Sequence, residues 1–345
     1  MLDLDPKNIL IIKPSSLGDV ITAVPVLRAL KRRFPQAKIT WLIAKSCLDV
    51  IENDPDLDDI IVFDRKALGK WSSPKAWAGI FALKRKIRKS NFDLVLDYQG
   101  LLRSGFFTSW SGAKNRIGFA NAREGATLFY TQKVVTDEIH TVDRNAELTE
   151  FVGAPVSPDD MKLFVNEASR EFTQNFINDN NLADSGYFVC VPPTRWVTKL
   201  YPTRYWRKVT AELSRHKPVV LLGSPSEYEI ALCEAVAQNQ SGPVINLAGK
   251  TTLKQLVGVI SEASGVICSD SAAQFIAPGT QTPCLSLIGP TKPERTGPFW
   301  GLGKALVADI PCQGCLKKRC HHISCMQSIS PELVVKTACE MFDLE

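Results

Sequence analysis

The chain has 345 residues, of which 45% are hydrophobic and 22% charged, and its formal net charge is +5. This length favours two domains, and the composition is ordinary for a soluble globular protein. The charge is too small to indicate a nucleic-acid partner by itself, no run approaches the ~20 apolar residues that span a bilayer, and the acidic N-terminus lacks the features of a signal peptide. We therefore expect a cytoplasmic protein that binds no nucleic acid.

Strand-like and helix-like segments alternate in the first half of the chain. Apolar runs predict strands at residues 8–13, 38–44, 59–64 and 92–99. Helical spacing of apolar residues predicts helices at 19–34 and 77–89. The second helix carries the basic run "LKRKIRK" after two aromatic residues, a pattern that fits an anionic membrane surface or, more simply, a solvated helix face.

The alternation resumes in the second half of the chain. Strands are predicted at 187–193, 218–225, 243–249, 264–271 and 282–290, and helices at 205–216, 228–239 and 253–263. This order predicts an α/β fold with two doubly wound, mostly parallel sheets. We place the linker in the composition shift at 152–160, so that the domains span 1–155 and 156–345. Ligands of such sheets bind beyond the C-terminal ends of the strands, so the loops that follow the strands should carry the chemistry.

The turn "KPSSLGDV", from Lys13 to Val20, joins the first strand to the first helix. Gly-containing turns of this kind usually cradle phosphate, but this one carries an acid, Asp19, where the helix begins. The residue type alone fits either a chemical role or simple capping of the helix N-terminus.

Side chains suited to phosphate and ribose follow two strands of the second half. Thr194, Arg195 and Lys199 offer a hydroxyl, a guanidinium and an ammonium group within six residues, a set that suits a diphosphate. Glu227 lies at a predicted helix N-terminus, where it can accept hydrogen bonds from a ribose diol or stabilise the helix dipole.

Two further loops complete the set. Asp270 and Ser271 precede a helix that opens with the small Ala272, so that backbone N–H groups form an anion site or the acid caps the helix. The Pro- and Gly-rich loop 289–298 is expected to close over a ligand, and it carries Lys292, Glu294 and Arg295.

The chain resembles the ADP-heptose:lipopolysaccharide heptosyltransferases over nearly its whole length. The resemblance is carried by residues 9–35 with the SSxGD turn, 96–105 ("LDYQGLLRSG"), 116–134, 140–145 ("HTVDRN"), 198–206, 221–227, 245–270, and 282–298 with the GPT-x-P-x-R-x-GP loop. The segment "FANAREGATLFY" is most similar to the heptosyltransferase I members, which add the first heptose to Kdo on the lipid A inner core. The family implies a GT-B fold of two facing Rossmann-like domains, with the acceptor on the N-terminal domain and the donor mainly on the C-terminal one. It also implies an inverting reaction without metal or cofactor at the inner face of the cytoplasmic membrane.

The resemblance assigns a role to each candidate in the turn and the donor loops. Asp19 matches the proposed catalytic base, which takes the proton of the attacking acceptor hydroxyl. Lys13 matches a lysine that holds the diphosphate or orients the base. Thr194 and Lys199 match donor-phosphate contacts, and Lys199 would offset the charge on the leaving ADP. Glu227 matches the acid that contacts the ribose.

The remaining assignments concern the donor helix and the acceptor. Asp270 and Ser271 match the pair near the diphosphate and the sugar, with Ala272 beside them, and Arg195 belongs to the same donor site. Arg103 and Arg123 are expected to contact the acceptor, because Kdo carboxylates and lipid A phosphates are anionic.

Four positions depart from the family pattern D-T-G-x-x-H and Lys-x-Trp-Pro. Ala272 replaces a glycine, Phe275 replaces a histidine, Tyr201 replaces a tryptophan, and Ser271 conservatively replaces a threonine. The first two leave open a different nucleotide sugar or acceptor. A non-catalytic nucleotide-sugar-binding homologue is a further alternative, although the presence of both Asp19 and Lys199 argues against it. No G-x-G-x-x-G follows a strand, which disfavours a dinucleotide-dependent dehydrogenase.

The chain has ten cysteines, and four of them cluster near the C-terminus with the spacing C-x2-C-x4-C-x4-C and two histidines between. These four are Cys312, Cys315, Cys320 and Cys325, and the histidines are His321 and His322. Free or redox-active thiols, a structural metal site and disulfides all remain open, although a reducing cytoplasm argues against disulfides. No metal is assigned to the reaction.

Overall fold

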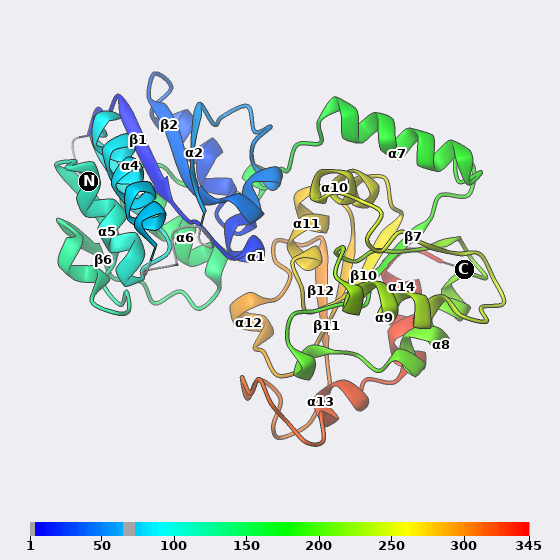
Figure 1. Ribbon diagram of the computed structural model, residues 1–345. Helices are drawn as coiled ribbons and strands as arrows, with labels where there is room; N and C mark the ends of the chain where they lie inside the picture. The colour runs from blue at the N-terminus through cyan, green and yellow to red at the C-terminus, as the bar shows by residue number, and fades with distance from the viewer. Residues whose placement is uncertain (1–3, 65–72, 345) are drawn as a thin grey trace. The chain divides into compact units, whose positions relative to one another are not determined.

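The computed structural model describes residues 4–64 and 73–344, which form two compact units, Met1–Phe164 and Val165–Glu345 (Figure 1). The described residues of each unit build one six-stranded sheet whose strand pairs are all parallel. The two sheets share one topology, because the order β3-β2-β1-β4-β5-β6 of the first recurs, read from its other edge, as β12-β11-β10-β7-β8-β9 in the second. This confirms the predicted α/β class with two doubly wound parallel sheets.

The first unit alternates strands and helices along the chain. Its strands are β1 (Asn8–Ile12), β2 (Lys38–Ala44), β3 (Asp59–Phe63), β4 (Leu94–Asp97), β5 (Asn115–Phe119) and β6 (Gln132–Val134). Its helices are α1 (Leu17–Ile21), α2 (Pro25–Arg33), α4 (Pro74–Lys89), α5 (Leu102–Ser111) and α6 (Thr141–Glu150), with short 3₁₀ turns η1 (Lys45–Val50), η2 (Ala126–Phe129) and η3 (Pro158–Asp160).

The centre of the first sheet is fully buried. The four residues Ile9–Ile12 of β1 have no exposed surface, as expected for a strand covered by helices on both faces. Leu10 and Ile12 pack with Leu42 of β2 and Phe107 of α5. The uninterrupted apolar run of β1 therefore predicted a buried strand correctly.

The single helix predicted at 19–34 is wrong, because the structure has two helices there. Helix α1 ends at Ile21 and α2 begins at Pro25. Pro25 has no N–H to donate to the carbonyl of Ile21, and its ring would clash with that carbonyl in a continuous helix. The N–H groups of Ala23 and Val24 instead donate to the carbonyls three residues before them, and Pro25 takes the first position of a new helix, where a proline is tolerated.

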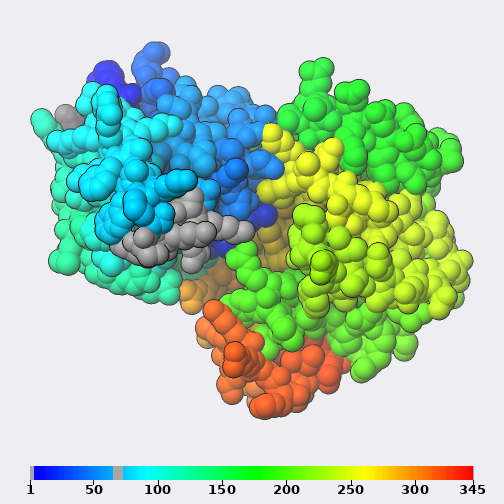
Figure 2. Space-filling view, in the orientation of Figure 1, coloured from blue at the N-terminus to red at the C-terminus, as the bar shows by residue number. Residues whose placement is uncertain are grey.

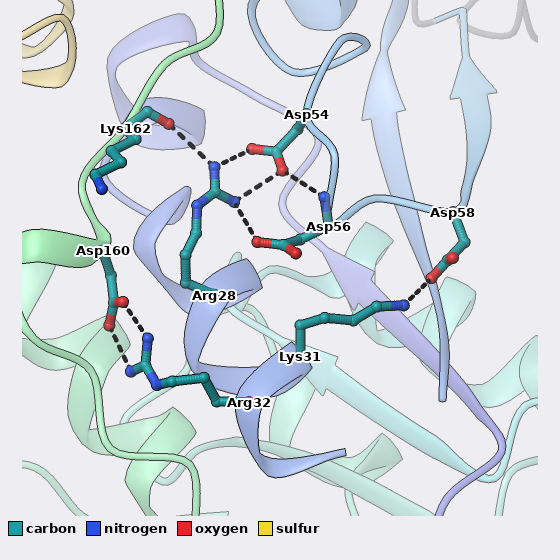
Figure 3. Close-up of polar contacts among 8 residues, drawn as sticks. All are labelled: Arg28, Lys31, Arg32, Asp54, Asp56, Asp58, Asp160 and Lys162. Carbon is teal, nitrogen blue, oxygen red and sulfur yellow. Dashed lines mark hydrogen bonds and ion pairs between the residues drawn. The ribbon is translucent and has the colours of Figure 1, made fainter. Parts of the chain in front are cut away.

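Basic side chains of α2 bind the segment predicted as the linker (Figure 3). Arg32 forms an ion pair with Asp160, and Arg28 donates to the carbonyl of Lys162 at 3.2 Å. Arg28 also pairs with Asp54, at 2.5 Å, in the connection between β2 and β3. These contacts hold residues up to 162 on the first unit, so the compact units divide after Phe164, whereas the composition placed the division after residue 155.

The second unit contains β7 (Phe188–Val191), β8 (Val219–Leu221), β9 (Val244–Asn246), β10 (Gly265–Ser269), β11 (Cys284–Ile288) and β12 (Gly303–Val307). Its helices are α7 (Glu167–Asp179), α8 (Thr203–Leu213), α9 (Glu227–Ala237), α10 (Leu253–Ser261), α11 (Ala273–Gly279), α12 (Pro293–Thr296), α13 (Ser324–Gln327) and α14 (Pro331–Met341), with a 3₁₀ turn η4 (Val197–Lys199). The core gathers Trp206 of α8, Met326 of α13 and Val334 of α14 against the central strands.

None of the helices formed by residues 4–64 and 73–344 is both long enough and apolar enough to cross a membrane.

Candidate functional site

The turn after β1 lies at the point where the strand order of the first sheet reverses, between β1 and β4. Such switch points are where doubly wound sheets bind ligands. Lys13 is only 5% exposed, and its ammonium donates to the carbonyl of Tyr98, just after β4, at 2.7 Å. Burial lowers the pKa of Lys13, while the charges of Asp19 and Asp97 act in the opposite direction.

Asp19 is the third residue of α1 and is part-exposed. Its Oδ2 accepts hydrogen bonds from the backbone N–H of Ser16, at 2.9 Å, and from the Ser16 hydroxyl, at 2.7 Å. The alternative that Asp19 is the N-cap is therefore wrong, because Ser16 occupies that position and Asp19 reaches back to it, as in a capping box. Oδ1 accepts no hydrogen bond from residues 4–64 or 73–344, so it can accept a proton from a substrate.

A buried carboxylate that the sequence reading did not single out shapes the neighbouring loop. Asp97, at the end of β4, has no exposed surface and accepts hydrogen bonds from the N–H groups of Gln99 and Gly100 and, at 2.7 Å, from the hydroxyl of Tyr130. Gly100 has a φ of +64°, a conformation that a residue with a Cβ rarely adopts. Burial raises the pKa of Asp97.

The two arginines expected at the acceptor lie on segments that are joined to each other, Arg103 in the first turn of α5 and Arg123 in the loop after β5. The N–H of Arg123 donates to the carbonyl of Gly100 at 2.9 Å, and the N–H of Leu102 donates to the Glu124 carboxylate at 3.3 Å. Both arginine side chains are exposed, and the guanidinium of Arg103 lies 5.5 Å from the centre of the Phe63 ring. Their residue types and exposure suit an anionic ligand.

The second unit gathers two of the predicted donor residues, Lys199 and Thr194, around a third, the buried Asp270. Asp270, which is 5% exposed, accepts through Oδ2 from the ammonium of Lys199 at 2.9 Å. Its backbone carbonyl accepts from the hydroxyl of Thr194 at 2.9 Å. The strand order explains why Thr194 and Lys199 lie close to Asp270. Strands β7 and β10 are neighbours at the switch point of this sheet, and their C-terminal ends lie at the same edge.

Two partners of Asp270 were missed by the sequence reading. The hydroxyl of Thr291 donates to Oδ2, and the amide of Gln274 donates to Oδ1 at 3.0 Å. Gln274 is in turn held by Ser286, whose hydroxyl donates to the side-chain oxygen of Gln274 at 2.8 Å. Thr291 follows β11, which is the neighbour of β10 in the sheet. Knowledge of the strand order would therefore have identified Thr291 as a residue near Asp270.

The other predicted donor residues are more exposed. Glu227 is the first residue of α9, but Ser226 caps that helix and accepts from the N–H of Glu229. The carboxylate of Glu227 is exposed, and its place in the first turn still favours the helix dipole. Arg195 is also exposed, on the same loop as Thr194.

The residues that depart from the family pattern differ in backbone conformation, burial and hydrogen bonding. Ala272 has a φ of −63°, so an alanine fits the backbone there without strain. The hydroxyl oxygen of Ser271 is buried without a hydrogen-bond partner among the described residues. Phe275 is 7% exposed, with its ring 6.0 Å from that of Phe299. Tyr201 is buried, and its hydroxyl donates to the carbonyl of Ile329.

The four clustered cysteines are free thiols in this structure, as are the other six. Cys312 and Cys315 are exposed, Cys320 is part-exposed and Cys325 is buried. Figure 2 shows the segment, in orange, at the surface. Within residues 4–64 and 73–344, no group of three or more Cys, His, Asp or Glu side chains is arranged to hold a metal ion.

Comparisons with known proteins agree on one family. Residues 80–325 match the family described as glycosyltransferase family 9 (heptosyltransferase). The chain is 30% identical over 329 residues to lipopolysaccharide heptosyltransferase 1 of Pseudomonas aeruginosa, covering 91% of this chain and 87% of that one. It is 27% identical over 300 residues to the lipopolysaccharide core heptosyltransferase OpsX of Haemophilus influenzae, covering 85% and 82%.

Solved structures show the same fold. The Escherichia coli heptosyltransferase WaaC with ADP-2-deoxy-2-fluoro heptose superposes with a TM-score of 0.76 at 21% identity, over 96% of this chain and 99% of that one. The predicted GT-B architecture, with two parallel-sheet α/β domains, is therefore confirmed.

Proposed function

Because this chain belongs to glycosyltransferase family 9, the heptosyltransferases, we propose that it moves heptose from ADP-heptose to the Kdo/heptose inner core of lipopolysaccharide. The observation that carries the proposal is the gathering of Thr194, Lys199 and Asp270 at the ends of neighbouring strands, in a chain of this family. The relatives with which it aligns are named as lipopolysaccharide heptosyltransferases.

The proposed base is Asp19. The acceptor hydroxyl oxygen attacks C1 of the heptose, its proton passes to Asp19, and the bond between C1 and the diphosphate oxygen breaks with its electron pair on ADP. One carboxylate oxygen is fixed by Ser16, so the side chain is oriented while Oδ1 remains for the proton. Lys13, whose ammonium donates to the carbonyl of Tyr98 and whose pKa is lowered by burial, holds the diphosphate or orients Asp19.

Apart from Lys13, the proposed donor residues lie in the second unit. Lys199 binds the diphosphate and offsets the charge that grows on the leaving ADP, which a divalent metal does in other glycosyltransferases. Asp270 fixes the position of that ammonium, and Thr194 contacts the diphosphate beside it. Glu227 accepts hydrogen bonds from the ribose, and Arg195 adds positive charge at the exposed edge of the donor site. Ser271 and Ala272 contribute the backbone at the start of α11. We propose a reaction that needs no metal.

The proposed acceptor is lipid-linked and anionic. Arg103, in the first turn of α5, and Arg123, in the loop after β5, are exposed and would bind Kdo carboxylates or lipid A phosphates. Helix α4 exposes Trp77 and Phe81, to 44% and 63%, together with the basic residues of its last turns, which supports peripheral contact with the cytoplasmic face of the inner membrane.

The test is transfer to Kdo2–lipid A from ADP-heptose without added metal, read as the mass of the acceptor. We expect a gain of one heptose, and an Asp19→Asn variant should be slower by at least about 100-fold because it has no base. Asn keeps an oxygen for Ser16, so the fold is retained. Asp49→Asn removes the same charge elsewhere in the first unit and should leave the rate unchanged. A normal rate for Asp19→Asn would reject the base.

A second candidate keeps the chemistry and changes the sugar or the acceptor. It is favoured by Phe275, which packs against Phe299 and offers no hydrogen-bond donor. Binding of ADP-heptose without transfer to Kdo2–lipid A would support another acceptor, and absence of that binding would support another donor. Binding of a nucleotide sugar without transfer to any acceptor would support a non-catalytic homologue.

A further inference from the structure

Two ammonium groups lie against one indole ring in the second unit. The Nζ of Lys199 is 4.6 Å from the centre of the Trp196 ring, and the Nζ of Lys318 is 4.9 Å from it. Lys199 is paired with Asp270, whereas Lys318 is exposed and forms no ion pair with a carboxylate of residues 4–64 or 73–344. A second, unneutralised cation therefore lies beside the candidate donor site.

Lys318 belongs to the segment Cys312–Cys320, which we call the tail segment. This segment is hydrogen-bonded to the loop after β11. The amide of Gln313 donates to the carbonyl of Thr291 at 3.0 Å, and the N–H of Leu316 donates to the carbonyl of Pro290 at 2.6 Å. Thr291 is itself a partner of Asp270, so the tail segment contacts one side of the Asp270 cluster.

The tail segment is also bound to the loop after β7. The buried hydroxyl of Thr198 donates to the carbonyl of Lys317 at 2.9 Å. This bond fixes the backbone next to Lys318, and the Trp196 ring then limits where its ammonium can lie. Lys318 is consequently held near Lys199 by the backbone contact at Lys317 and by the contact of its own side chain with Trp196.

Charge balance gives this second cation a role. Asp270 neutralises Lys199, so that pair alone adds no net positive charge at the site. A nucleotide-sugar diphosphate carries a negative charge on each phosphate and gains more when the bond to the sugar breaks. An anion of this kind is bound more tightly where cations outnumber the carboxylates around it.

We propose that Lys318 is a phosphate-binding residue of the donor site and holds the diphosphate together with Lys199. The inference rests on the proposed function and adds to it a residue from the cysteine-rich tail. The tail segment is thus a wall of the donor site.

The test compares Lys318→Met with Lys317→Met in the full-length protein. Both substitutions remove one positive charge from neighbouring exposed positions, so long-range electrostatic effects are matched. Binding of ADP and of adenosine is measured by titration calorimetry. We expect Lys318→Met to bind ADP roughly fivefold to tenfold more weakly, Lys317→Met to bind it within about twofold of wild type, and adenosine affinity to be the same in all three.

Lys318→Arg separates charge from packing. Arginine keeps the cation and should recover most of the ADP affinity. Equal ADP affinity in wild type and Lys318→Met, or equal losses in the two Met variants, would overturn the inference while leaving the proposed function intact. If the wild-type protein failed to bind ADP at all, the proposed function would fail and this inference with it.

Discussion

At the scale of single residues, Asp270 is the group on which the donor site depends. It is buried and accepts hydrogen bonds from Lys199, Thr291 and Gln274, so its charge is balanced by one cation and two neutral donors. Removal of that cation leaves a buried carboxylate without a counter-charge, which is costly. The structural role of Lys199 and its proposed catalytic role are therefore linked, and an experiment must separate them.

A double-mutant cycle makes that separation. Lys199→Met should lower the free energy of unfolding by about 1–3 kcal/mol, because Asp270 keeps its charge and loses its cation. Lys199→Met/Asp270→Asn should recover much of that stability, but heptose transfer should stay slow in both variants because the leaving group lacks its cation. Urea unfolding and the transfer assay measure the two effects. Recovery of transfer in the double variant would contradict the assignment of Lys199.

The tail thiols should differ in reactivity. Hydrogen bonds from the backbone N–H groups of His322 and Ile323 lower the pKa of Cys320, whereas burial and then the charges of the neighbouring thiols raise the pKa of Cys325. A lowered pKa gives more thiolate at a given pH, and the thiolate is the form that reacts. Iodoacetamide at pH 8 should therefore label Cys320 well before Cys325, as peptide mass spectrometry would record. Labelling of Cys325 first would contradict this order.

At the scale of elements, the basic face of α2 holds the end of the first unit. Asp160 accepts from Arg32 and from the N–H of Ser157, at 2.8 Å, and is almost fully buried. Burial raises the pKa of Asp160, but these hydrogen bonds outweigh it and hold the pKa below the usual 3.8. The ion pair therefore connects a helix of the first half to a segment whose composition resembles a linker.

This connection predicts a pH-dependent stability difference. Asp160→Asn should lower the free energy of unfolding by about 1–2 kcal/mol at pH 7, a value reduced because Arg32 is half-exposed. The carboxylate stabilises the fold above the unfolded-state pKa of about 3.8, and this contribution is lost as the pH falls through the lower folded-state value. The difference between the two proteins should accordingly shrink below about pH 4 in urea unfolding curves.

The matched control is Asp59→Asn, which breaks the pair between Lys38 and Asp59, whose side chains are 52% and 44% exposed. Its loss should cost under about 0.5 kcal/mol at pH 7. Equal costs for both substitutions would mean that burial does not strengthen the pair at Asp160.

The sequence predicted strands and helices better than it predicted which loops lie together. Apolar runs located nine of the twelve strands formed by residues 4–64 and 73–344, but not β5, β6 or β12, which are partly exposed. The loops after the predicted strands supplied Thr194, Lys199 and Asp270, because strand ends in a parallel sheet share one edge. Thr291 and Lys318 were missed because their roles depend on which loops meet, and apolar periodicity carries no information about that. The break before Pro25 was missed for a different reason, since apolar spacing continues across it while the hydrogen-bond ladder does not.

At the scale of the whole molecule, the two units divide the proposed chemistry between them. Asp19 and Lys13 lie in the first unit, and the other proposed donor residues lie in the second. The turn with Asp19 and the cluster of Thr194, Lys199 and Asp270 each lie where the strand order of their own sheet reverses. The proposal thus assigns nucleotide binding mainly to one unit and proton transfer to the other.

Hydrogen–deuterium exchange can test this division in the full-length protein. ADP should slow exchange in the loops of the second unit at 192–199, 270–273, 289–292 and 313–318, because a bound ligand lowers the population of open states. The turn 13–19 should change little with ADP alone. Protection confined to the turn, with none in the second unit, would contradict the placement of the donor.

The first sheet takes all its strands from the first unit, and this affects how the chain folds while it is being synthesised. All six of its strands lie before residue 164, and its central strand β1 is made first. On the ribosome this unit can close its sheet while the remaining residues are still being translated, over roughly 10–40 s at about 5–20 residues per second. We expect nascent chains stalled after the first unit clears the exit tunnel to resist proteolysis, so that the half carrying Asp19 folds before the half carrying Lys199 exists.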